Sequence, residues 1–226
     1  MTHLHLPRVY AATDALLGTV DRMTPAEFAG DSVLPGWSRA HVVAHVAMNA
    51  RCFGRAIGAA LRGELVAVYE STEARDADIR GAAGLPVGDL RELLFETCGA
   101  WRDVADDVDE DHLTARLERV PGGPQLSVAE GLVARWREVE IHHADLGLAW
   151  TPASWSPEFV DEVLPSLVEF RSREVDLTLH SPEGSIQVGS GGPEVRGSRA
   201  DLAWWLMGRG SGDRLTGDLP TLGPWR

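Results

Sequence analysis

The sequence contains no lysine, so arginine supplies all 21 of its basic residues. Aspartate and glutamate together number 34, which gives a net charge of -13. The chain also lacks any run of basic residues that would neutralise the phosphates of a nucleic acid or of an anionic bilayer. We therefore expect neither a nucleic acid nor a membrane as a partner.

Cysteines and long apolar runs are also scarce. Cys52 and Cys98 lie far apart, form no CxxC pattern and fall within predicted helices, so we expect two reduced thiols. No apolar run approaches the roughly 18 residues that a membrane-spanning helix needs. The first residues, "MTHLHLPRVY", lack the apolar core of a signal peptide. Together these absences predict a cytoplasmic protein.

The first two thirds of the chain have the pattern of helices. Apolar residues recur at helical spacing, and capping residues, prolines and glycines mark the ends of the segments. Several of the predicted helices are long and amphipathic, and short or medium connections separate them, which indicates an up-and-down four-helix bundle. The helices are predicted over residues 7–20, 38–63, 71–80, 86–108 and 127–150, with a short one starting at the capping box 24–27.

The pattern changes after "TPASWSP", which ends at Pro157. Residues 174–197 alternate between apolar and polar, with turn residues at "SPEG" and "GSGGP", and this is typical of strands joined by hairpins. Ser198 then caps a short apolar helix that contains Trp204 and Trp205, both expected in the core. The predicted fold is therefore α+β, with a helical bundle over residues 1–152 and a small α+β domain over 153–226.

The helix predicted over 127–150 carries two glutamates and two histidines in the stretch "EVEIHH". At about 100° per residue, His143 falls inside the apolar stripe of this helix, where we expect a packed core histidine. Glu140 lies on one flank of the stripe. Glu138 and His142 lie on the other flank, four residues apart, so their side chains project from one face. The spacing thus selects Glu138 and His142 as the pair able to bind a metal.

A second helix, predicted over 38–63, offers His41 and His45. His45 lies at the edge of its apolar stripe, whereas His41 lies about 40° further toward solvent. One histidine combined with Glu-x-x-x-His makes a three-ligand site with an open coordination position, which suits a catalytic zinc ion held inside a bundle. Two alternatives stay open: Glu138 and His142 form an exposed pair within their helix, or His41 and His45 bind a metal together.

Two segments in this order, "LPGWSRAHVVAHVAMNA" and "RWREVEIHHADLG", resemble the mycothiol-dependent maleylpyruvate isomerase family, within the DinB-like metal-binding bundles. The later segment "VRGSRADLAWWLMGRG" is similar to the sterol-carrier-like C-terminal domain of that family. The resemblance covers essentially the whole chain. It implies a DinB-like four-helix bundle that carries a metal on His45, Glu138 and His142, with the small domain closing over it.

The resemblance also implies an activity. Members of the family use a divalent metal, usually zinc, to bind the thiol of mycothiol, and the thiolate then converts maleylpyruvate to fumarylpyruvate by addition, rotation and elimination. Arg209, in the "GRG" after the last predicted helix, is implied as the partner of a substrate carboxylate. Asp145 either supports His142 from behind or faces solvent. A mycothiol S-transferase that acts on another electrophile, and a non-catalytic protein that binds a metal or a small ligand, are the alternative functions.

Overall fold

A computed structural model describes residues 6–225 of the chain. Contacts between Cα atoms divide the chain into two compact units, of which one ends at Leu146 and the other begins at Gly147. The boundary predicted at residues 152–153 lies a few residues further along. The combination of a helical unit with a small mixed unit confirms the α+β fold class. Among residues 6–225, no helix is both long and apolar enough to cross a membrane.

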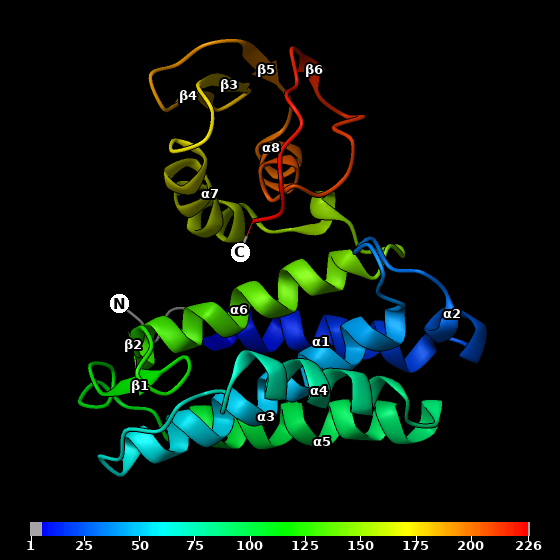
Figure 1. Ribbon diagram of the computed structural model, residues 1–226, viewed down its shortest axis with the longest axis vertical. Helices are drawn as coiled ribbons and strands as arrows, with labels where there is room; N and C mark the ends of the chain where they lie inside the picture. Colours follow the sequence, from blue (N-terminus) through cyan, green and yellow to red (C-terminus); the bar gives the residue numbers. More distant parts are fainter. Residues whose placement is uncertain (1–5, 226) are drawn as a thin grey trace. The chain divides into compact units, whose positions relative to one another are not determined.

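The first unit is a bundle of helices in which α1 lies next to α6 (Figure 1). Helix α3 packs against α5, α4 and α6, and α1 also contacts α5. A short antiparallel ribbon precedes α6. The elements of this unit are α1 (Leu6–Arg22), α2 (Pro25–Ala29), α3 (Arg39–Leu61), α4 (Thr72–Ala83), α5 (Val87–Asp106), β1 (Arg116–Glu118), β2 (Gln125–Ser127) and α6 (Val128–Asp145).

Capping residues set where α3 and α6 begin. Ser127 accepts a hydrogen bond from the backbone N–H of Glu130, and the Glu130 carboxylate accepts one from the backbone N–H of Ser127, which completes the predicted capping box. At the start of α3, His41 takes the place that glutamate usually fills, because its Nδ1 lies 2.8 Å from the Ser38 hydroxyl. This local role occupies His41 at the helix terminus.

The end of α6 differs from the sequence prediction, which continued the helix to about Trp150. The helix ends at Asp145, and Gly147 adopts a positive φ of 64° that an L-residue with a side chain rarely adopts. The last carbonyl groups are satisfied by two donors from elsewhere in the unit. Val33 N–H, before α3, donates to Asp145 O, and Nε of Arg39, the first residue of α3, donates to Leu146 O at 2.6 Å. The apolar periodicity of the sequence continues beyond Asp145. A prediction from periodicity alone therefore places the end of the helix too late.

A buried guanidinium links the central helices. Arg135 of α6 is fully buried, with an exposed fraction of 0%. It donates to the carbonyl oxygen of Val46 at 3.0 Å and to Oδ1 of Asn49 at 2.8 Å, both in α3, and to the sulfur of Cys98 in α5 at 3.3 Å. These bonds fix the position of α6 along the axis of α3.

The second unit contains η2 (Pro152–Ser154), two helices and a four-stranded sheet in the order β4-β3-β5-β6. The β3–β5 pair is parallel and the other two pairs are antiparallel. The strands and the Ser198-capped helix match the sequence prediction. The elements are α7 (Pro157–Arg171), β3 (Leu177–Ser181), β4 (Gly184–Val188), β5 (Glu194–Arg196), α8 (Arg199–Leu206) and β6 (Thr216–Gly217).

The sequence analysis did not predict α7. Its start signals are nevertheless present, because the Ser156 side chain accepts from the Phe159 N–H and Pro157 occupies the first turn. The interior Pro165 obscures the helical pattern that follows. The start signals at Ser156 and Pro157 would have sufficed to predict the helix.

The capping box of α6 gives a first prediction. Replacing Ser127 with alanine should lower the free energy of unfolding by about 1 kcal/mol, because the N–H of Glu130 loses its acceptor. Thr114→Ala, which removes an exposed hydroxyl from the preceding loop, is the matched control and should change it by less than about 0.5 kcal/mol. Urea unfolding followed by circular dichroism measures both. Equal stability of the two variants would contradict the capping role.

Candidate metal centre

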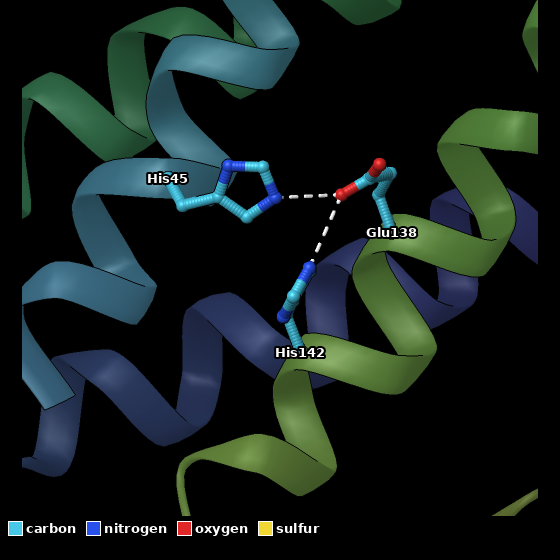
Figure 2. Close-up of side chains that lie close together, drawn as sticks. All are labelled: His45, Glu138 and His142. Atoms are coloured by element: carbon cyan, nitrogen blue, oxygen red, sulfur yellow. Dashed lines mark hydrogen bonds and ion pairs between the residues drawn. The ribbon is translucent and has the colours of Figure 1, made fainter. Parts of the chain in front are cut away.

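The structure brings His45, Glu138 and His142 together from two facing helices (Figure 2). His45 lies in the second turn of α3, and its Nε2 is 2.8 Å from Oε2 of Glu138 in α6. His142, one turn further along α6, places its Nε2 3.3 Å from the same oxygen. One ligand atom from each residue lies within 4.8 Å of the others. Within the described part of the chain, no other group of three or more His, Cys, Asp or Glu side chains is arranged to hold an ion.

The three side chains of the cluster differ in burial. The His45 side chain is 2% exposed, His142 is 13% exposed and Glu138 is 30% exposed. The two imidazoles meet edge to face, with ring centroids 4.4 Å apart. The Trp37 ring also packs edge to face against His45, with the ring centroids 5.7 Å apart. The rings are therefore fixed by packing, and the carboxylate is the most accessible of the three groups.

Asp145 supports His142 from behind. Its Oδ2 lies 2.8 Å from Nδ1 of His142, and the Asp145 side chain is fully buried. The solvent-facing alternative for Asp145 is therefore wrong. A carboxylate on Nδ1 holds the proton there and leaves the Nε2 lone pair directed toward the centre.

The electrostatics of the cluster keep Glu138 ionised. Burial raises the pKa of Glu138, but the charges and hydrogen bonds of His45 and His142 outweigh it and hold that pKa well below its usual range. Burial lowers the pKa of His45 to about 4, although Glu138 opposes this. Burial also acts to lower the pKa of His142, yet its hydrogen bonds with Asp145 and Glu138 raise it. The centre thus holds one carboxylate and a neutral His45.

The other residues of the "EVEIHH" stretch lie outside the centre. His143 is 1% exposed, and its Nε2 lies 2.8 Å from the hydroxyl of Thr19 in α1. This position confirms that His143 is a core histidine. Glu140 is buried elsewhere on α6. His41 is engaged at the start of α3, and it does not belong to the cluster that His45 forms with Glu138 and His142.

Two imidazole nitrogens and one carboxylate oxygen fit a divalent ion of the zinc type, with a coordination position left for a further ligand. Ligand atoms around a tetrahedral zinc ion at 2.0–2.2 Å lie about 3.3–3.6 Å from one another. Here the Nε2 atoms of His45 and His142 lie 2.8 and 3.3 Å from Oε2 of Glu138, and all three atoms lie within 4.8 Å of one another. Small rotations of the side chains would therefore be enough to place them around one ion.

Sequence reasoning missed two neighbours of this centre, Arg75 and Tyr69. A guanidinium nitrogen of Arg75 in α4 lies 3.4 Å from Nδ1 of His45. The Tyr69 hydroxyl accepts a hydrogen bond from Asn49 at 3.2 Å, and burial together with the charge of Glu138 raises the pKa of Tyr69 to about 12. No motif marks either residue, because α4 and the segment before it join the site only through the packing of α4 on α3.

A scan against protein families matches residues 9–147 to the family described as the mycothiol maleylpyruvate isomerase N-terminal domain. The chain belongs to this family. The match spans more than half of the sequence and contains all three residues of the cluster. It confirms the family resemblance of the two sequence segments that carry His45, Glu138 and His142.

Solved structures extend the similarity to the second unit. A mycothiol-dependent maleylpyruvate isomerase is 26% identical to this chain, with a TM-score of 0.91 over 100% of this chain and 97% of that one. A histidine-to-alanine mutant described under the same enzyme name is 25% identical, with the same TM-score and coverage. A search of curated proteins returned no match.

Arg209 lies in the second unit, just after α8. It lines a cavity of about 240 Å³ together with Trp204, Trp205 and Arg214. Its guanidinium carbon lies 5.8 Å from the ring centroid of Trp204, and its Nη1 donates to the Met207 carbonyl at 3.4 Å. Trp205 is buried as predicted, whereas Trp204 is partly exposed at this cavity. Arg209 is thus a partly buried cation beside an aromatic wall.

The second prediction concerns the metal. Purified protein should hold one zinc ion per chain, and His45→Ala or Glu138→Ala should lower the zinc content at least tenfold, because each removes one of three ligands. His112→Ala, which alters a loop histidine that pairs with Asp109, should keep full zinc content. Elemental analysis after dialysis gives the result. Equal zinc in all four proteins would exclude this site.

Proposed function

We propose that this protein is a metal-dependent, mycothiol-dependent cis–trans isomerase of the maleylpyruvate type. The observation that carries the proposal is the His45–Glu138–His142 cluster, because it offers three ligands from two helices and leaves room for a fourth. Membership of the family and the likeness to two solved structures across the whole chain support the same activity.

The three residues would hold the ion through Nε2 of His45, Nε2 of His142 and a carboxylate oxygen of Glu138. A divalent metal, when bound, lowers the pKa of a coordinating thiol far below its free value of about 8.5, so that mycothiol reacts as the thiolate. Glu138 contributes one negative charge and the two imidazoles contribute none. This donor set leaves net positive charge at the centre, which favours an anionic sulfur ligand.

The reaction needs only the thiolate and a conjugated double bond. The sulfur adds to one carbon of the double bond, and the electron pair moves onto the neighbouring carbonyl oxygen. The former double bond is now single and rotates. The electron pair then returns, the trans double bond forms and the thiolate leaves, so mycothiol is regenerated. The protein's part is to hold sulfur and substrate together while that rotation occurs.

The substrate has two carboxylates, and the overall charge of the chain repels it. Arg209 is our candidate for one carboxylate, since a guanidinium binds a carboxylate through two parallel hydrogen bonds. Its place in a cavity beside Trp204 supports this role. The lining of that cavity also contains Asp201 and Asp213.

An assay of the zinc-loaded protein with maleylpyruvate tests the function. Fumarylpyruvate should appear only when mycothiol is present, and the mycothiol concentration should stay constant. Stoichiometric loss of mycothiol with a stable adduct would instead identify an S-transferase. Bound zinc with no conversion of any electrophile would identify a binding protein, and either result would overturn the isomerase.

A further prediction concerns Arg209. Arg209→Ala should lower kcat/KM for maleylpyruvate by about 10- to 100-fold, because a charge-assisted pair with the substrate is lost. The zinc content should not change. Arg173→Ala is the control, since Arg173 is 71% exposed and pairs only with Glu169 on the surface of α7. Unchanged turnover by Arg209→Ala would show that another residue binds the carboxylate.

A further inference from the structure

A cavity of about 250 Å³ lies between α3, α4 and the segment that joins them. Its lining contains three arginines, Arg51, Arg55 and Arg75, against two acidic residues, Glu70 and Asp78. This local excess of positive charge is the reverse of the net charge of -13 on the chain. A cavity of this kind favours an anionic group.

Arg75 connects this cavity to the metal centre. One of its guanidinium nitrogens lies 3.4 Å from Nδ1 of His45, and its guanidinium carbon lies 5.6 Å from the ring centroid of Tyr69. Its carboxylate partner is its chain neighbour Asp76, at 2.8 Å, and the Asp76 side chain is 45% exposed. The Arg75 side chain itself is 23% exposed, so this pair is partly buried. A guanidinium has five N–H donors, and the pair with Asp76 uses only part of them.

The other two arginines of the cavity are engaged differently. Arg55 donates hydrogen bonds to the backbone carbonyls of Ala67 and Val68, which hold the segment before α4 in place. Arg51 contacts the sulfur of Met48 in its own helix. Neither has a hydrogen bond to His45, Glu138 or His142. Of the three arginines in this cavity, Arg75 is thus the one that places its positive charge next to the metal centre.

A carboxylate could take the place of the contact between Arg75 and His45. A guanidinium only donates hydrogen bonds, and at 3.4 Å its contact with Nδ1 of His45 is long. A carboxylate is a stronger acceptor for a guanidinium than a ring nitrogen is. The position of Arg75 would therefore bring such a carboxylate next to the centre.

We propose that Arg75 binds a carboxylate of the substrate at the edge of the metal centre and that the adjoining cavity receives this end of the molecule. The proposal rests on the proposed function for the identity of the substrate. Bidentate binding by the planar guanidinium would hold the carboxylate while the double bond next to it becomes single. Arg75 then determines specificity for an acidic substrate from within the first unit.

Titration calorimetry with maleate tests this role without turnover, because maleate is a cis dicarboxylate and no thiol is present. We expect zinc-loaded wild-type protein to bind maleate, Arg75→Met to bind it about 10- to 100-fold more weakly, and Arg75→Lys to give an intermediate affinity. The control Arg80→Met alters an exposed arginine of the same helix and should bind as the wild type does. Zinc content should be equal in all four proteins.

Equal maleate affinity in Arg75→Met and the wild type, or no binding by the wild type, would overturn the proposal. Loss of zinc from Arg75→Met would also overturn it, because Arg75 would then support the ligand His45 and not the substrate. The isomerase itself can fail separately. Absence of maleylpyruvate conversion with maleate binding that still depends on Arg75 would remove the proposed reaction and keep the carboxylate site.

Discussion

The buried guanidinium of Arg135 is the constraint on which the metal centre depends. It lies one turn before Glu138 in α6, and it donates to the carbonyl of Val46, the residue that follows His45 in α3. A second bond to Asn49 fixes the same helix pair. Because a buried donor without its acceptor is costly, α6 cannot slide along α3 without breaking these bonds. The shift that satisfies Arg135 also places His45 opposite Glu138 and His142.

Around this pair of helices, each polar group has a distinct task. Asp145 orients His142, the core residue His143 bonds to Thr19, and His41 caps the start of α3. Of the two adjacent histidines, His142 therefore belongs to the centre and His143 belongs to the packing of α1 against α6. Two imidazoles packed next to one ionised carboxylate form a donor set that fits a divalent cation, and a bound divalent cation would leave residual positive charge there. That combination suits the activation of a thiol.

Much of this arrangement was readable from the sequence, and the reasons are local. Helical spacing separates Glu138 and His142 from Glu140 and His143, and the Ser127 capping box fixes where that helix begins. Periodicity could not stop α6 at Asp145, because the stop depends on the positive φ of Gly147 and on donors from another segment. The neighbours Arg75 and Tyr69 were invisible for a related reason. Their place beside His45 is a result of tertiary packing, and no local pattern encodes it.

The central claim is that His45, Glu138 and His142 hold a metal whose remaining position takes the thiol of mycothiol. X-ray absorption at the zinc edge tests it most directly, because sulfur at about 2.3 Å is distinguished from nitrogen and oxygen at about 2.0–2.2 Å. The zinc-loaded protein should show only nitrogen and oxygen neighbours, and one sulfur neighbour should appear when mycothiol is added. A spectrum that mycothiol leaves unchanged, or sulfur already present from the protein's own cysteines, would contradict the account.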